Sequence, residues 1–97
     1  MNLIPGTQYF AANGDLAVGT SGKPIRIFSI ELISGATAST LKVYNSTAAT
    51  NNQYAQVDGV ASQSVVIGYA GGKRFPAGAF VDMDANGSAT VVYTEEF

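Results

Sequence analysis

The sequence contains no cysteine, no histidine and no tryptophan, and only 12% of its 97 residues are charged. A chain without cysteine forms no disulfide and offers no thiolate. A chain without histidine lacks the commonest general base near neutral pH and the commonest metal ligand. These absences exclude most familiar kinds of enzyme site, so we expect no enzymatic activity and no bound cofactor.

Charge of either sign is also scarce. Five Lys and Arg against seven Asp and Glu give a formal net charge of −2. Such a balance gives no basic footprint for a phosphate backbone or an anionic membrane surface. Residues 1–6 lack the basic stretch and apolar run of a signal peptide, and no apolar run approaches the roughly 20 residues that cross a bilayer. We expect neither nucleic acid nor a membrane as partner.

What the sequence does contain is a large apolar fraction for its length. Hydrophobic residues make up 46% of the chain, which is too much for a disordered segment. Ninety-seven residues are enough for one core only, so we expect a single domain over residues 1–97. Val and Ile outnumber Leu, and side chains that branch at Cβ favour sheet over helix. The sequence therefore predicts an all-β domain.

Alternating apolar residues predict about eight short strands. The clearest alternation covers residues 25–34, where Arg26, Phe28, Ile30 and Leu32 are expected on the core face and Ile25, Ile27, Ser29, Glu31 and Ile33 on the other. Further strands are expected at residues 8–10, 16–20, 41–44, 53–58, 64–69, 79–84 and 90–95. The dipeptide Asn86-Gly87 is the strongest hairpin signal between them. This spacing predicts a single antiparallel β-sandwich or jelly roll.

One segment resembles part of a calcium-binding loop. Asp82, Asp84 and Asn86 occupy positions 1, 3 and 5 of that loop, and Gly87 occupies position 6. The match fails at position 12, where the bidentate Glu is replaced by Tyr93. We favour a plain strand that points its acidic side chains to solvent and Ala79, Val81 and Met83 inward. A weak metal site on Asp82, Asp84 and Asn86 is the alternative.

Five Tyr and five Phe are more aromatic side chains than one small core holds. The surplus predicts association with other molecules, because exposed aromatic and large apolar side chains mark interfaces. Residues 1–7 are expected to form an apolar arm that precedes the first strand and docks on a neighbour. The predicted interface residues are the apolar anchors Leu3, Ile4, Tyr9, Phe10 and Phe97, with Lys73 and Arg74 as rim cations.

Two segments resemble a known class of protein. Residues 71–82 read Gly-Gly-Lys-Arg-Phe-Pro-Ala-Gly-Ala-Phe-Val-Asp and precede the Asn-Gly turn and a final Thr-Val-Val-Tyr-Thr-Glu strand, and residues 30–44 form a second such segment. Both resemble the small β-sandwich virion proteins of tailed bacteriophages. The resemblance implies a capsid decoration, or cement, protein on the virion surface, made in the host cytoplasm. Its implied partners are the major capsid protein and further copies of itself.

Two other interpretations remain open. The chain could be a tail or fibre component whose loops bind a host-surface glycan, for which Asn51, Asn52, Gln53 and Tyr54 are the candidate residues. It could also be a single sandwich domain with no role in a virion.

Overall fold

The computed structural model describes residues 3–49 and 52–96 of the chain. Over these ranges the chain forms eight β-strands and no helix. The strands are β1 (Leu3–Phe10), β2 (Leu16–Ala17), β3 (Ile25–Ser34), β4 (Thr40–Asn45), β5 (Gln53–Asp58), β6 (Ser64–Phe75), β7 (Ala79–Met83) and β8 (Gly87–Glu96). Among the described residues there is accordingly no helix that could span a membrane.

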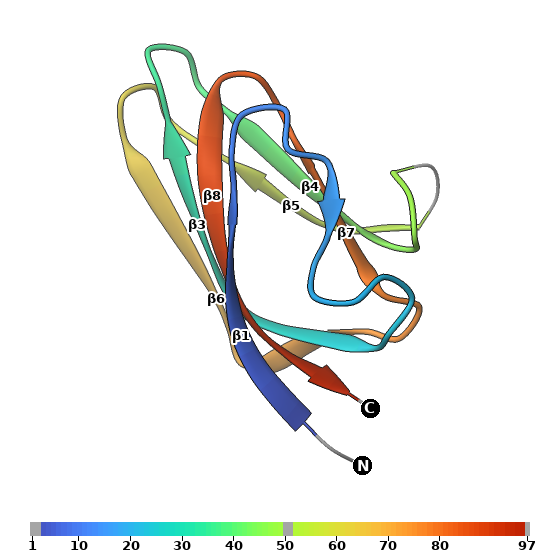
Figure 1. The fold of residues 1–97 in the computed structure, drawn as a ribbon. Coiled ribbons are helices and arrows are strands. Elements are labelled where there is room, and N and C mark those ends of the chain that lie inside the picture. The colour runs from blue at the N-terminus through green and yellow to red at the C-terminus, as the bar shows by residue number, and fades with distance from the viewer. Residues whose placement is uncertain (1–2, 50–51, 97) are drawn as a thin grey trace.

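The strands form two antiparallel four-stranded sheets that pack face to face (Figure 1). The first sheet has the order β1-β8-β3-β6, and the second has the order β2-β7-β4-β5. Only β4 and β5 are consecutive strands that pair with each other, so nearly every connection passes from one sheet to the other. This is the connectivity of a jelly roll. The predicted fold class is confirmed.

The hydrophobic core lies between the two sheets. On β4, β5 and β7 the buried side chains alternate with exposed or half-buried ones, as the pleat requires. On β4, Leu41 and Val43 are fully buried, and on β7 the inward residues are those that the sequence predicted. The buried apolar residues are Phe10, Val18, Ile25, Ile27, Ile30, Leu32, Leu41, Val43, Ala55, Val57, Phe75, Ala79, Val81, Met83, Ala89 and Val91.

A β-bulge in β3 corrects the predicted core face of that strand. Ile25 and Ile27 are buried, whereas Arg26 and Phe28, which were expected in the core, are only half-buried. Pairing with both neighbouring strands shifts between Ile27 and Ser29. Because one extra residue changes which side of the sheet the next residue faces, the prediction was wrong before the bulge and right for Ile30 and Leu32 after it.

Strands β1, β4, β6 and β8 are longer than the sequence predicted, and β2 and β7 are shorter; β2 covers Leu16–Ala17 instead of residues 16–20. Residues 3–7, expected to precede the first strand, are the first half of β1, and Leu3 pairs with Glu96 of β8. Strand β6 continues through Gly71 and Gly72, which were expected to form a turn. Both glycines have positive φ, and they lie in an irregular stretch of β6 opposite the β3 bulge. Glycine permits that backbone because it has no Cβ.

The Asn86-Gly87 turn does not form the predicted hairpin. It connects β7 to β8, but these strands belong to different sheets. Gly87 also lacks the positive φ of a tight two-residue hairpin turn. The turn is held by long-range contacts instead, because the carbonyl of Asn86 accepts a hydrogen bond from the Gly35 amide at 2.7 Å. The dipeptide therefore marks a corner between the sheets.

Candidate functional site

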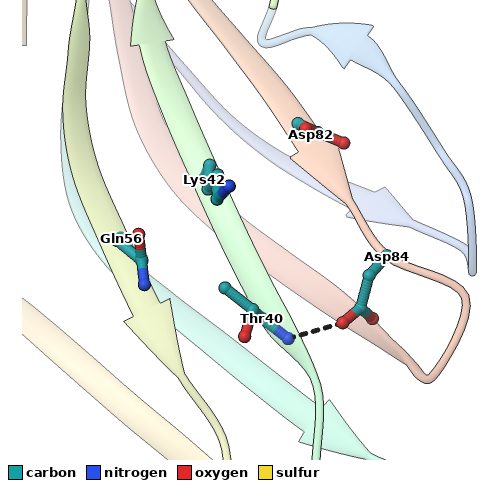
Figure 2. A pocket seen from close by; sticks show the side chains of 5 residues that line it. All are labelled: Thr40, Lys42, Gln56, Asp82 and Asp84. Atoms are coloured by element: carbon teal, nitrogen blue, oxygen red, sulfur yellow. Dashed lines mark hydrogen bonds between the residues drawn. The ribbon is translucent and has the colours of Figure 1, made fainter.

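The outer side of the second sheet carries a shallow polar hollow of about 380 Å³. Figure 2 shows its lining: Thr40 and Lys42 come from β4, Gln56 from β5, and Asp82 and Asp84 from β7 and the turn after it. Lys42 lies at the centre of this arrangement, because it pairs with Gln56 on one side and with Asp82 on the other. The hollow therefore combines one cation, one amide, one hydroxyl and two carboxyl groups.

Hydrogen bonds to Asp84 join the β3–β4 connection to the end of β7. Its carboxylate accepts hydrogen bonds from the Ser39 hydroxyl at 2.6 Å, the Thr40 amide at 2.8 Å and the Asn86 amide at 3.0 Å. Burial alone would raise the pKa of Asp84, but the hydrogen bonds from Ser39, Asn86 and Thr40 outweigh it and hold that pKa below the usual value. The carboxylate of Asp84 thus stabilises the fold.

Asp82 is in the opposite situation. Burial, followed by a hydrogen bond and like-charge repulsion from Asp15, raises the pKa of Asp82 above its usual value. The positive charge of Lys42 offsets only part of that rise. Asp82 thus interacts with Asp15, whereas Asp84 is hydrogen-bonded to Thr40, as the dashed line in Figure 2 shows.

These contacts bear on the calcium pattern of Asp82, Asp84 and Asn86. Both oxygens of Asp84 are already hydrogen-bonded within the chain, one of them to the Asn86 amide. Among the described residues, no group of three or more Asp and Glu side chains is placed to hold a metal ion. Lys42, Gln56 and Asp82 are the remaining lining residues that can make polar contacts in the hollow.

The second candidate site is the outward side of the first sheet. We call it the outer face and define it by the outward residues Leu3, Pro5, Thr7 and Tyr9 of β1, Thr90, Val92, Thr94 and Glu96 of β8, Arg26, Ser29, Glu31 and Ile33 of β3, and Val66, Gly68 and Arg74 of β6. Tyr9 is 64% exposed, Val66 63% and Val92 40%. Threonine, aliphatic and aromatic side chains thus cover most of a four-stranded surface.

Of the predicted apolar anchors, three are exposed and one is not. Leu3, Ile4 and Tyr9 are at least half exposed. Phe10 is 1% exposed and belongs to the core, so its prediction as a surface anchor was wrong. The reason is alternation along β1, which turns Phe10 inward and Tyr9 outward. Phe97 lies outside the described residues.

Both predicted rim cations have partners within the chain. The Lys73 ammonium donates a hydrogen bond to the Tyr54 carbonyl at 2.6 Å and lies 5.7 Å from the centre of the Tyr69 ring. Arg74 forms an ion pair with Glu96 at 2.9 Å. That hydrogen bond raises the pKa of Arg74 and lowers the pKa of Glu96. Arg74 is still exposed, so it can act as a rim cation as well.

The predicted glycan-binding residues are only partly brought together. Tyr54 is 44% exposed, and its ring lies 5.7 Å from that of Phe75. The Gln53 amide donates a hydrogen bond to the Gln56 side chain at 3.0 Å. Asn52 is exposed, and Asn51 lies outside the described residues. Tyr54, Gln53 and Gln56 are therefore all exposed on β5, but the contacts within the chain pair the Tyr54 ring with Phe75 and the two glutamines with each other.

Comparison with known proteins gives a structural likeness. No protein-family model matches the chain, and no curated protein matches it. A solved structure described as "Bacillus endospore appendages form a novel family of disulfide-linked pili" contains a similar chain, with a TM-score of 0.59 and 13% sequence identity. The likeness covers 98% of this chain and 88% of that one. It shows a shared fold between this chain and a small β-rich structural protein.

Proposed function

We propose that this chain is a structural subunit of a multi-copy protein assembly. The observation that carries the proposal is the outer face, where each of the four strands exposes at least one large apolar side chain: Leu3 and Tyr9 on β1, Val92 on β8, Ile33 on β3 and Val66 on β6. Soluble monomers rarely expose a large contiguous apolar patch unless it contacts another molecule. The polar hollow offers no comparable case for catalysis, since the oxygens of Asp84 are used within the fold.

The structural neighbour supports the same class of function. The subunit with the similar fold comes from pili described as disulfide-linked. This chain contains no cysteine, so its copies cannot be joined by disulfides. Its association must depend on burial of apolar surface and on polar contacts across the interface.

In its specific form, the proposal is a capsid decoration protein that binds the expanded shell of a tailed bacteriophage. The strand and turn pattern of residues 30–44 and 71–82 supports this assignment by resemblance. Binding only the expanded shell stabilises that state by mass action. We place the shell contact at the end of β1, where Leu3 and Ile4 are exposed.

The test is loss of DNA from heated particles. Particles that lack this chain should release DNA at a lower temperature than complete particles, and purified chain added back should restore retention. An added-back Ile4→Asp variant should restore it less well, whereas a Val60→Asp variant, altered at a similarly exposed site on the loop between β5 and β6, should restore it fully. Equal retention with and without the chain would refute the decoration role.

A tail or fibre component with glycan-binding loops is the second candidate. It is favoured by the exposed Tyr54 ring on β5, the strand that also carries the exposed Gln53 and Gln56 amides, because sugars bind to aromatic faces and amide groups together. A glycan array probed with the wild-type chain and with a Tyr54→Ala variant decides between the two candidates. Glycan binding that disappears in the variant would favour the fibre role.

A further inference from the structure

We propose that two copies of this chain associate through their outer faces about a two-fold axis that crosses β8 at Val92. This inference deepens the proposed function by assigning one surface to a second copy. It leaves the exposed end at Ile4 for contact with other proteins.

Charge is distributed unevenly over the outer face. The end near the chain termini holds Arg26, Arg74 and Glu96, where the Glu96 carboxylate is paired with Arg74. That end therefore has a net charge of about +1 at neutral pH. Further along β3 the face carries Glu31, an exposed carboxylate for which no ion pair is found within the described chain. The rest of the outer face is uncharged.

The register of the strands places these two charges symmetrically. Arg26 pairs with Thr94 of β8, and Glu31 pairs with Thr90. Val92 lies midway between those two threonines and opposite Ser29, where the register has already shifted past the bulge. The positive and negative groups are therefore equally distant from Val92 along the strand direction.

A two-fold axis in the interface plane, perpendicular to the strands at Val92, reverses the strand direction between the copies. Arg26 of one copy then faces Glu31 of the other, and the pair occurs twice because an isologous interface repeats every contact. Sheets that pack face to face lie about 10 Å apart, a separation that an Arg and a Glu side chain bridge together. The same axis sets Val92 against its own copy.

Apolar contacts match under the same operation. Pro5 and Tyr9 lie on β1 at equal distances from Thr7, which pairs with Val92. The two-fold axis therefore brings Pro5 of one copy onto Tyr9 of the other. Gly68 of β6 lies on the axis row opposite Ser29, so the edge away from β1 permits close approach.

The available area indicates a weak, reversible dimer. Four strands of about eight residues present a surface of about 500 Å² per copy, or about 1,000 Å² in total, which is at the lower limit for specific interfaces. An affinity in the micromolar range fits that size. Dimers of this strength form where many copies are concentrated in one assembly.

Sedimentation velocity of the purified full chain over a concentration series up to about 300 μM tests the proposal. The wild type should shift from monomer to dimer. Val92→Lys, which sets two like charges at the axis, should stay monomeric, whereas Val60→Lys, at an exposed position off the outer face, should dimerise like the wild type. Thr7→Lys is the second axis variant, should Val92→Lys fail to fold by circular dichroism.

Charge-reversal variants test the pairing of Arg26 with Glu31 separately. Glu31→Arg should weaken the dimer by about tenfold or more, because it opposes two cationic groups across the interface. Asp58→Arg, the same change on an exposed residue of the other sheet, should leave it unchanged. Equal weakening by both would overturn the proposed register.

A wild-type chain that is monomeric at every concentration would overturn the proposal, and so would equal dimerisation of Val92→Lys and wild type. A monomeric wild type whose Val92→Lys variant fails to bind particles would assign the outer face to another protein and also refute self-association. These results are separate from the heating experiment, because dimerisation can persist when the particles retain DNA without the chain.

Discussion

Two aspartates two residues apart show how contacts of single side chains set opposite behaviour. Asp84 accepts three hydrogen bonds, and its pKa is lowered. Asp82 faces Asp15, and its pKa is raised. The usual pKa of an aspartate side chain is 3.8. A group whose pKa falls on folding stabilises the native state when ionised, and a group whose pKa rises does the reverse.

Replacing Asp84 should therefore destabilise the protein at neutral pH. We expect Asp84→Asn to lower the free energy of unfolding by about 1–3 kcal/mol at pH 7, because charge-assisted hydrogen bonds from Ser39 and Thr40 are lost. The contribution of the wild-type carboxylate is complete above pH 3.8 and is lost as pH falls through its lowered pKa. Urea unfolding at several pH values measures this. Asp58→Asn, on an exposed strand position, is the control and should change stability little.

Replacing Asp82 should have the opposite effect on the free energy of unfolding at neutral pH. Ionisation of Asp82 costs stability as pH rises from 3.8 through its raised pKa, and the full cost is present above that pKa. We expect Asp82→Asn to be more stable than wild type at pH 7 and to lose that advantage below pH 3.8. Thermal unfolding at both pH values measures the difference. A variant that is less stable than wild type at pH 7 would contradict the interpretation of the Asp15 contact.

Glycine at position 6 is required by a close ring contact. A Cβ there would lie 2.6 Å from the Cζ and Oη atoms of Tyr93, whose ring also lies against Gly19. We expect Gly6→Ala to cost about 1–3 kcal/mol of unfolding free energy, because the ring must move from a packed position. Gly68→Ala is the matched control, since a Cβ at that position meets no atom within 4 Å. Equal effects of the two changes on denaturant midpoints would refute this account.

At the scale of a strand, the bulge in β3 decides which residues form the core. Ile27 is fully buried and Phe28 is half-buried, the reverse of the alternation expected from the sequence. We expect Ile27→Ala to cost about 2–5 kcal/mol, and Phe28→Ala to cost less, about 1–2 kcal/mol, because part of its ring is already in water. Chemical denaturation of the two variants gives the comparison. A larger loss for Phe28→Ala would mean that the bulge is absent.

The strand boundaries show what alternation can and cannot predict. The bounds of β3 and β5 were predicted correctly, since each is a clean run between turn residues. The first half of β1 was missed because Pro5-Gly6 breaks the pattern, although an edge strand tolerates proline. The predicted range of β6 ended too early because Gly71-Gly72 is typical of a turn. A bulge is set by pairing with neighbouring strands, which the local sequence does not describe.

The candidate site was predicted less completely than the fold. Leu3, Ile4 and Tyr9 were predicted as interface anchors, and the structure exposes them, while their contact with a partner stays a prediction. The outer face as a unit depends on which strands are neighbours. The role of Asp84 was also missed. Its spacing to Asn86 is a local signal that could have indicated it, because an Asp side chain often caps the amide two residues on.

At the scale of the whole molecule, the low charge and the absence of cysteine fit a chain whose contacts with other molecules depend on apolar surface. Two sheets bury one core, and the outward side of the first sheet carries a second apolar surface that one chain alone does not cover. A surface of this kind suits repeated, non-covalent contacts between subunits.

The central claim is that this chain is a structural subunit present in many copies. The most direct measurement is its copy number in purified intact particles, determined by quantitative mass spectrometry against the major shell protein. The account predicts a number of the same order as that of the major shell protein. A few copies per particle, or none, would contradict it.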